Sequence, residues 1–488
     1  MADSTPLIAE EALVDGNPST VTLSASGRIE WRGKSSGCLS VDADVLGYAA
    51  EGSALRIRAF VKKSGGCCCG HKEVVRERRD VVLEPSSEES LGLWCERLRQ
   101  CIDSLARPQN LLILVNPYGG KKSASKIFQK EVAPLLAAAD VKYTLEETQY
   151  RFHAKEIAHA LDISKYDGIV CVSGDGIIVE VINGLLEKED WPTAIKMPIG
   201  IIPAGSGNGM AKSLLDSVEE ACVASNATFA VIRGHKRALD VATVLQEETR
   251  FFSVLMLSWG IVADIDIESE KYRWMGGARI DFYSIVRMID LRHYNGRVSF
   301  VPAPGYEVYG NPVSEQEESL SRLNSLSKSE KQCAYLGPMC SFEPQEWRTY
   351  DGPFISVWLH NVPWGSETVM PAPDAKFSDG YLDLILVRDS PKLALIETMA
   401  KLSDGGHVKS PHVLYLKVKA FYLEPGQRAN ETDKGGIIDC DGEVLARGQG
   451  TYKFGQQQDL MAYGPPIYMT VDKVPTIMQM ASASQNEG

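Results

Sequence analysis

The chain has 488 residues, of which 44% are hydrophobic and 24% are charged, so it can form two or three packed domains and is not globally disordered. Its net charge of −13 argues against a general nucleic-acid binder. The acidic N-terminus does not resemble a secretory signal, and the longest uncharged apolar stretch, 251–263, is too short to span a bilayer as a helix. Eleven cysteines without such a signal indicate reduced thiols in the cytosol.

Residues 1–106 are predicted to form a β-rich unit. Short β-like runs at 20–23 and 55–61 are separated by turn residues and precede an amphipathic helix at 90–105. Several strands followed by one helix are typical of a pleckstrin-homology-type module, and a plain β-rich extension packed on the rest is the alternative. The expected apolar face of the helix carries Leu91, Trp94, Leu98, Cys101 or Ile102, and Leu105.

The run Cys67-Cys68-Cys69 follows a Lys, Ser and Gly stretch and is predicted to lie in a solvated loop. Zinc binding is disfavoured, because adjacent cysteines cannot easily all reach one tetrahedral ion. Reversible acylation of these thiols is a second hypothesis.

Strands and helices alternate over residues 107–235. Pro134 falls inside the first expected helix and predicts an irregularity there. The alternation predicts a mostly parallel sheet covered on both faces. Strands are expected at 111–115, 141–146, 167–172 and 199–202, and helices at 123–139, 154–161 and 176–186.

Residues 236–470 are predicted to form an antiparallel domain with few helices, one of them around 282–290. The Ser-, Glu-, Pro- and Lys-rich composition of about 302–345 predicts a mobile insertion, and 471–488 are expected to be a frayed tail. The strands are expected at 239–245, 251–257, 297–301, 354–360, 381–387 and 413–421.

Three glycine-bearing turns follow predicted strands, at 116–121, 173–176 and 203–209. In open α/β sheets, ligands bind beyond the carboxyl ends of the strands. Glycine lets the backbone approach a phosphate, and N–H groups at a helix start donate to it. Three such turns in one unit favour a nucleotide site, and tight turns without a ligand are the alternative. Neither a Walker loop nor a dinucleotide fingerprint is present.

Asp175 lies in the second turn, where a carboxylate repels phosphates unless it has a chemical role or a cation. In phosphoryl transfer an Asp orients the acceptor hydroxyl and takes its proton as the new bond forms. An ordinary Asp, with a pKa of about 3.9, is ionised at pH 7. The alternative is that Asp175 caps the helix starting at Gly176.

Six segments in order resemble lipid kinases of the diacylglycerol-kinase and sphingosine-kinase superfamily: LLILVNPYGGK, SGDGIIVEVINGL, IIPAGSGNGMAKSL, SWGIVADIDIESEKYRWMGGARIDF, MPAPDAKFSDGYLDLILV and DCDGEVL. The fourth is closer to sphingosine kinases than to glycerolipid kinases. The resemblance implies an α/β nucleotide-binding domain, a C-terminal antiparallel β-sandwich that binds lipid, and a cleft between them.

The resemblance also implies residue roles. Asp175 matches the general base, and Ser173, Gly174 and Gly176 flank it at the substrate. Tyr118 stands where the family often has a basic residue. The implied ATP-binding residues are Asn116, Pro117, Tyr118, Thr148, Gln149, Tyr150, Arg151, Phe152, Glu180, Gly205, Ser206, Gly207, Arg273, Arg279, Asp441, Gly442 and Glu443.

Asp441 and Glu443 also match a segment at the Mg²⁺ ion, and carboxylates of this kind reach Mg²⁺ directly or through water. The alternative for the Asp-Gly pair is a surface hairpin turn. The metal ligands themselves are left unassigned.

Asp266 matches the position that binds the polar head of a sphingoid base, whose ammonium and hydroxyls both pair with a carboxylate. Neutral diacylglycerol offers no ammonium. The alternative for Asp264 and Asp266 is alternate exposed positions on a strand. Apolar residues of 251–261 and 357–369 are candidates for an acyl slot.

The expected activity is therefore phosphorylation by ATP, with Mg²⁺, of the primary hydroxyl of a sphingoid long-chain base such as sphingosine, sphinganine or phytosphingosine. The alternatives are a ceramide kinase, a diacylglycerol kinase and a lipid-binding scaffold without catalysis. A cytoplasmic protein in peripheral contact with a membrane is expected, because the lipid must be drawn from a bilayer. The sequence leaves the preferred base and the oligomeric state open.

Overall fold

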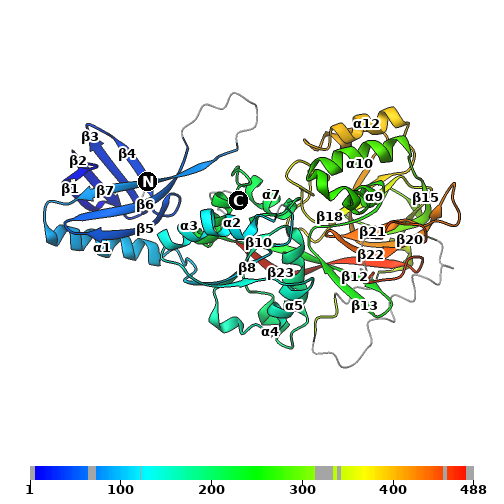
Figure 1. The fold of residues 1–488 in the computed structure, drawn as a ribbon, viewed down its shortest axis with the longest axis horizontal. Coiled ribbons are helices and arrows are strands. Elements are labelled where there is room, and N and C mark those ends of the chain that lie inside the picture. The colour runs from blue at the N-terminus through cyan, green and yellow to red at the C-terminus, as the bar shows by residue number, and fades with distance from the viewer. Residues whose placement is uncertain are drawn as a thin grey trace.

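The computed structural model describes residues 6–63, 73–120, 122–313, 334–337, 342–453 and 459–479. Figure 1 shows a β-rich N-terminal unit at one end, an α/β unit in the middle and a β-sandwich unit at the other end. None of the helices in these described ranges has the length and hydrophobicity that a membrane span requires. Cys67 to Cys69 lie outside the described residues.

The N-terminal unit is an antiparallel sheet with the strand order β4-β3-β2-β1-β7-β6-β5, followed by helix α1. The Ser87 side chain caps α1 by accepting from the Ser90 N–H at 3.1 Å. Leu91, Trp94 and Leu98 are buried against the strands, as their spacing predicted. Its elements are β1 (Pro6–Val14), β2 (Asn17–Ser24), β3 (Arg28–Gly33), β4 (Gly37–Ser40), β5 (Val45–Glu51), β6 (Ala54–Lys62), β7 (Arg76–Glu84) and α1 (Glu88–Asp103).

This unit shares a core with the α/β unit. Leu46 and Phe60 pack among the buried side chains of the α/β unit, and the Phe60 ring lies 5.4 Å from the Phe229 ring. The buried Arg76 side chain donates to Glu220 at 2.8 Å and to the Phe60 carbonyl oxygen at 2.9 Å. The N-terminal unit is therefore docked on the α/β unit.

The α/β unit contains a parallel sheet in the order β11-β10-β8-β9. Alternate residues of β8 pack on opposite faces: Leu112 and Leu114 face α4 and α5, whereas Leu111 and Ile113 face α3 and α8. The predicted sheet with two covered faces is confirmed. The strands are β8 (Asn110–Val115), β9 (Lys142–Glu147), β10 (Gly168–Ser173) and β11 (Ile199–Pro203).

The helices of this unit include the irregularity that Pro134 predicted. A π-helical turn, Phe128–Val132, separates two α-helical segments directly before Pro134, which has no N–H to donate. The helices are α2 (Ala124–Ile127), α3 (Ala133–Ala138), α4 (His153–Ala160), α5 (Asp175–Leu186), α6 (Trp191–Ala194), α7 (Gly209–Asp216) and α8 (Ala224–Arg233), with a 3-10 turn at Ile163–Lys165.

The sandwich unit is antiparallel, with the strand order β22-β21-β14-β18-β19-β20-β23 and further strands beside it. Its strands are β12 (Lys236–Gln246), β13 (Thr249–Ser253), β14 (Met256–Gly260), β15 (Tyr294–Pro302), β16 (Asn311–Pro312), β17 (Arg348–Asp351), β18 (Ser356–His360), β19 (Leu382–Val387), β20 (Leu414–Arg428), β21 (Ile437–Cys440), β22 (Glu443–Arg447) and β23 (Ile467–Gln479). Its α-helices are α9 (Ile261–Glu268), α10 (Ala278–Ile289) and α12 (Lys392–Ala400), and 3-10 turns occur at Ser269–Met275, Pro344–Glu346 and Gly406–Lys409.

One expectation and one alternative for this unit are wrong. The single strand at 251–257 is two strands, β13 and β14, because the backbone at Val254 and Leu255 donates to the Asp441 side chain instead of continuing one ladder. Asp264 and Asp266 lie in helix α9 and not on a strand.

The expected tail is also wrong as far as residue 479. Strand β23 pairs with β12 and β20, and Met478 pairs in parallel with Ile199 of β11, so this strand joins the sandwich to the nucleotide sheet. Pro475 argued against a strand in this segment, since the proline nitrogen cannot donate a hydrogen bond to a neighbouring strand. The β12–β23 register shifts between Leu239 and Val241, where that proline lies opposite. Residues 480–488 lie outside the described residues.

Part of the expected mobile insertion is packed. Tyr335 is buried, with its ring 4.6 Å from the Trp191 ring and 5.4 Å from the Phe252 ring, and its N–H donates to the Leu186 carbonyl oxygen. Residues 314–333 and 338–341 lie outside the described residues.

Candidate active site

The three glycine turns meet at one edge of the parallel sheet, because β8, β10 and β11 are neighbours that end there. Gly120 has φ +51°, and a Cβ on it would lie 2.9 Å from the Gly205 carbonyl carbon. A Cβ on Gly205 would lie 2.3 Å from the Gly174 Cα. A larger residue at either position would therefore push the turns apart, and glycine lets the three backbones touch.

The first turn is closed by Asn116. Its side-chain oxygen accepts hydrogen bonds from the N–H groups of Tyr118 at 3.0 Å and Gly119 at 3.1 Å. Pro117 lies between Asn116 and Tyr118 in the chain, and the Tyr118 side chain is 64% exposed. The first turn therefore has a fixed backbone and an exposed side chain at its tip.

Asp175 is the first residue of α5, directly after Gly174. Its carboxylate accepts from the N–H groups of Gly209 at 2.8 Å and Met210 at 2.9 Å, which are the first two residues of α7. The alternative that Asp175 caps its own helix is wrong, since it caps α7. Burial raises the pKa of the Asp175 carboxyl, and the two hydrogen bonds from α7 oppose that shift. Ser173 and Gly176 flank it, Ser173 buried and Gly176 partly exposed.

The third turn contacts a loop of the sandwich unit. Asn208 lies in the left-handed region with φ +59°, and its side chain accepts from the Gly205 N–H at 2.9 Å and donates to Glu367 at 2.6 Å. The Glu367 N–H donates to the Gly207 carbonyl oxygen at 2.9 Å. Ser206 lies within this turn. Sequence reasoning missed Glu367, because a contact between distant loops leaves no local signal in the sequence.

The loop 148–152 is held by Glu180. One carboxylate oxygen accepts from the Phe152 N–H at 3.0 Å and the other from the Ala154 N–H at 3.1 Å. The Thr148 N–H donates to β8 through the Val115 carbonyl oxygen at 2.9 Å. Glu180 therefore positions this loop. Contact of its residues Thr148, Gln149, Tyr150, Arg151 and Phe152 with ATP stays a prediction.

Arg151 joins the two units. Its Nε donates to Glu443 at 3.0 Å, and its guanidinium lies 4.4 Å from the Phe152 ring centre. Two segments that sequence reasoning assigned to the nucleotide, 148–152 and 441–443, are thus brought together although they lie far apart in the chain.

Asp441 occupies a two-residue hairpin turn with Gly442 between β21 and β22, and its side chain is buried and not at the surface. Its carboxylate accepts from the Ser253 hydroxyl and the N–H groups of Val254 and Leu255, each at 3.0 Å, and from the Met256 N–H at 2.7 Å. Burial raises the pKa of Asp441 to about 6 against these bonds. Asp441 therefore holds the β13–β14 connection in place.

The two aspartates of α9 differ. Asp264 is buried and accepts from the Tyr294 hydroxyl at 2.5 Å and from Arg292 at 3.1 Å. Asp266 is partly exposed, and its carboxylate takes no hydrogen bond from the described residues. Burial raises the pKa of Asp266, and the charge of Arg279 opposes that shift. Asp264 thus has a structural role, because it holds Tyr294 and Arg292, whereas the Asp266 carboxylate is available to a ligand.

Arg273 and Arg279 are two of the residues predicted to bind ATP, and we expect them to contact its phosphates. Arg279 forms an ion pair with Glu270. The side chain of Arg273 lies outside the described part of the chain. Their contacts with phosphate stay predictions.

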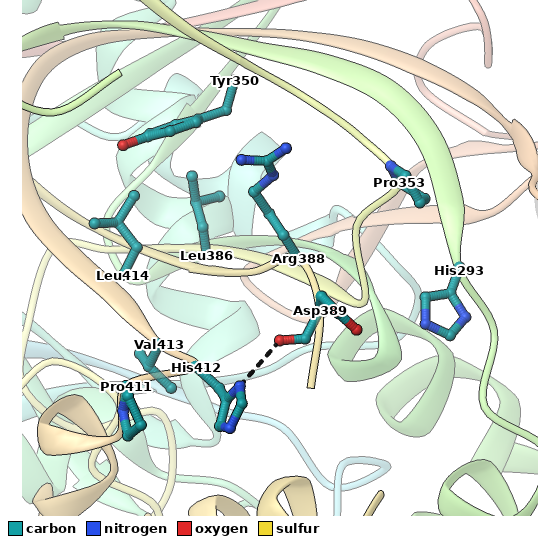
Figure 2. A pocket seen from close by; sticks show the side chains of 10 residues that line it. All are labelled: His293, Tyr350, Pro353, Leu386, Arg388, Asp389, Pro411, His412, Val413 and Leu414. Atoms are coloured by element: carbon teal, nitrogen blue, oxygen red, sulfur yellow. Dashed lines mark hydrogen bonds between the residues drawn. The ribbon is translucent and has the colours of Figure 1, made fainter. Parts of the chain in front are cut away.

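A cavity of about 790 Å³ lies in the sandwich unit (Figure 2). His412 Nδ1 lies 3.2 Å from the Asp389 backbone oxygen, and Arg388 and Tyr350 line another side. None of the predicted site residues lines this cavity, so the candidate site is defined by the glycine turns and their neighbours.

The comparisons with known proteins agree with the fold and the motifs. Residues 110–244 match the diacylglycerol kinase catalytic domain, and 345–455 match the YegS C-terminal NAD kinase beta sandwich-like domain. A diacylglycerol kinase structure from Bacillus anthracis str. Sterne, at 17% identity and a TM-score of 0.50, covers 77% of this chain and 98% of its own, which shows a shared fold. The predicted α/β unit followed by an antiparallel sandwich is confirmed.

Curated relatives are closer in sequence. The chain is 55% identical over 471 residues to sphingosine kinase 2 of Arabidopsis thaliana, with 96% of each chain covered. It is 35% identical over 358 residues to sphingosine kinase 1 of Homo sapiens, which covers 70% of this chain and 87% of that protein. With its nucleotide turns, its sandwich and these relatives together, the chain belongs to the sphingosine kinase family.

Proposed function

We propose that this lipid kinase transfers the γ-phosphoryl group of ATP to the primary hydroxyl of a sphingoid long-chain base. The observation that carries the proposal is the position of the Asp175 carboxylate, at the junction of glycine turns from three neighbouring parallel strands. Helix α5 starts at this junction, and the positive end of its dipole favours phosphate oxygens there. The Asp175 carboxylate adds the general base that phosphoryl transfer to a hydroxyl requires.

Asp175 accepts the proton of the attacking hydroxyl as the oxygen–phosphorus bond forms. A carboxylate cannot deprotonate an alcohol in advance, so the proton moves late, in a loose transition state with little bonding to either oxygen. Because burial raises its pKa, Asp175 is a stronger base than an ordinary Asp. The hydrogen bonds from α7 hold the carboxylate in one orientation.

Mg²⁺ is proposed as the partner of ATP, where it would neutralise charge on the phosphates. Within the described ranges, no group of at least three His, Cys, Asp or Glu side chains is placed to hold a metal ion. Asp441 already takes four hydrogen bonds, so Glu443 fits better as a ligand from this turn. A site of this kind suits Mg²⁺, which commonly binds through one or two carboxylates, phosphates and water.

The lipid head is proposed to bind at Asp266, because its carboxylate has no hydrogen bond from the described residues and pairs well with an ammonium. We expect Asp266→Ala to raise the KM for sphingosine roughly tenfold or more and to leave the KM for ATP nearly unchanged. Steady-state kinetics with each substrate varied in turn measures both values. An increase confined to the KM for ATP would contradict the assignment.

Contact with a bilayer is proposed through α10 and α12. Exposed apolar side chains on these helices include Ile285 at 62%, Ile289 at 71% and Leu393 at 81%. The two helices are neighbours, since Lys392 donates to the Ile289 carbonyl oxygen at 2.6 Å (Figure 1). An apolar surface of this kind is typical of a membrane-interaction site.

We also propose that the chain works at the cytoplasmic face of a membrane, because its described cysteines are free thiols and thiols stay reduced in the cytosol. The described cysteines without a disulfide are Cys38, Cys95, Cys101, Cys171, Cys222 and Cys440.

The test of the proposed function is phosphate transfer from radiolabelled ATP to sphingosine, phytosphingosine, ceramide and diacylglycerol. We expect label on the free bases and little on the other two lipids. Label on ceramide or diacylglycerol alone would select one of those kinases instead. A wild type that transfers no more label than Asp175→Ala would identify a lipid-binding scaffold.

A further inference from the structure

Three polar side chains on one buried face of the sandwich sheet have no hydrogen-bond partner among the described residues. They are Ser258 on β14, His360 on β18 and Asp439 on β21, each 0% exposed. The strands are adjacent, and Ser258 pairs with Asp439 on one side and with Trp358 on the other. Because residues two apart in a strand share a face, His360 lies on the same face as Trp358.

One end of this face reaches the catalytic turn. A Cβ on Gly365 would lie 3.3 Å from His360 Cε1 and 3.6 Å from the Trp358 ring. A Cβ on Gly207 would lie 3.8 Å from the Gly365 carbonyl oxygen and 3.5 Å from Asp175 Oδ2. The polar face is therefore connected to Asp175 through two glycines.

The other end reaches the proposed ammonium site. Helix α9 packs on β21 through Ala263 and Ile267, which contact Ile437 on the same face as Asp439. Burial and the nearby charge of Asp266 both raise the pKa of Asp439. Asp439 and Ser258 thus lie between the two carboxylates to which the proposed function assigns the lipid head.

A buried carboxylate without donors is unfavourable, since it has lost its hydration and gained no hydrogen bond. A ligand that supplies two donors removes this cost. The two oxygens of a carboxylate match two hydroxyls on adjacent carbons, each of which donates one hydrogen bond. A sphingoid base has such a pair when its head carries two neighbouring secondary hydroxyls.

We propose that Asp439, supported by Ser258, binds the secondary hydroxyls of the base and makes the enzyme prefer phytosphingosine, which has two of them on adjacent carbons, over sphinganine, which has one. The inference rests on the proposed function. The primary hydroxyl then lies at Asp175 and the ammonium at Asp266, with the secondary hydroxyls at Asp439 between these two carboxylates. Asp439 is a specificity residue and takes no part in the proton transfer.

The test compares kcat/KM for phytosphingosine and sphinganine in the wild type, Asp439→Asn and Ser258→Ala. We expect the wild type to prefer phytosphingosine roughly tenfold, as one hydrogen bond to a buried acceptor without another partner would give. In Asp439→Asn the ratio should fall towards one, mainly through loss of activity on phytosphingosine, with the KM for ATP unchanged. Ser258→Ala should lower the ratio less.

Cys440→Ala is the matched control, because Cys440 is the buried neighbour of Asp439 on the opposite face of the strand. It should leave the ratio unchanged even if it lowers the melting temperature. A wild type without the preference, or an Asp439→Asn variant that affects both bases equally, would overturn the inference. If Asp439→Asn does not fold, the ratio in Ser258→Ala decides. A wild type that phosphorylates neither base would instead contradict the proposed function.

Discussion

Two Asp-Gly pairs, one in each half of the kinase, look alike in the sequence and differ in the structure. Asp175 in the α/β unit accepts two hydrogen bonds from the start of α7 and lies where three glycine turns meet. Asp441 in the sandwich accepts four and is enclosed by the β13–β14 connection. Asp175, with two hydrogen bonds, can still accept one from a substrate. Asp441, with four, holds the fold.

The largest expected effect separates the two aspartates by activity. Asp175→Asn should lower kcat for sphingosine about a hundredfold or more, since it removes the base but keeps the shape. Its free energy of unfolding should fall by only about 1 kcal/mol, because one capping bond is lost. Single-turnover kinetics and denaturant unfolding measure the two quantities. A variant with wild-type turnover would remove the role proposed for Asp175.

The converse change tests Asp441. Asp441→Asn places an amide against buried N–H donors and should cost about 3 kcal/mol of the free energy of unfolding, at roughly 1–3 kcal/mol for each donor left without an acceptor. Urea denaturation followed by circular dichroism measures the loss. If Asp441→Asn is as stable as the wild type but fails to bind ATP, the carboxylate has a ligand role that its four hydrogen bonds do not indicate.

The pH dependence sharpens the comparison. Burial raises the pKa of Asp175, and the base must be ionised to accept a proton, so activity should be lost as the pH falls through this raised pKa. The acid limb of kcat/KM should therefore lie above the ordinary Asp value of about 3.9. A pH–rate profile locates it, with unfolding followed at each pH as the control. An acid limb at or below the ordinary value would contradict the buried position of the carboxylate.

The smallest expected effect concerns the link between the two halves. Arg151 and Glu443 are partly exposed, and such a pair contributes up to about 1 kcal/mol. Glu443→Gln should raise the KM for ATP roughly threefold to fivefold, because Arg151 loses its ion-pair partner and the turn loses the carboxylate proposed for Mg²⁺. Glu397→Gln, which breaks an exposed pair with Lys401 in the sandwich unit, is the matched control and should leave the KM for ATP unchanged. Equal effects of the two variants would show that the link is unimportant.

The local parts of this picture could be predicted from the sequence. Apolar runs predicted β8, β10 and β11, and the glycines after these strands predicted the three turns. Both signals are local, since each lies within the few residues that form the strand or the turn. Pro134 likewise marked the irregular helix.

The parts that depend on distant segments could not be predicted in this way. Nothing near Asp175 indicates that it caps α7, and nothing near Asp441 indicates that it splits 251–257 into two strands. Asp439 reads as an ordinary strand residue until its register with Ser258 is known. Strand β23 was missed for a related reason, because the partner strands that hold it outweigh the break expected at Pro475.

The measurement that tests the central claim most directly is the structure of a complex with a non-hydrolysable ATP analogue and sphingosine. The account predicts that one Asp175 oxygen lies about 2.6–3.2 Å from the primary hydroxyl, with that hydroxyl in line with the γ-phosphate. A complex in which the hydroxyl is bound by another group, far from Asp175, would contradict it.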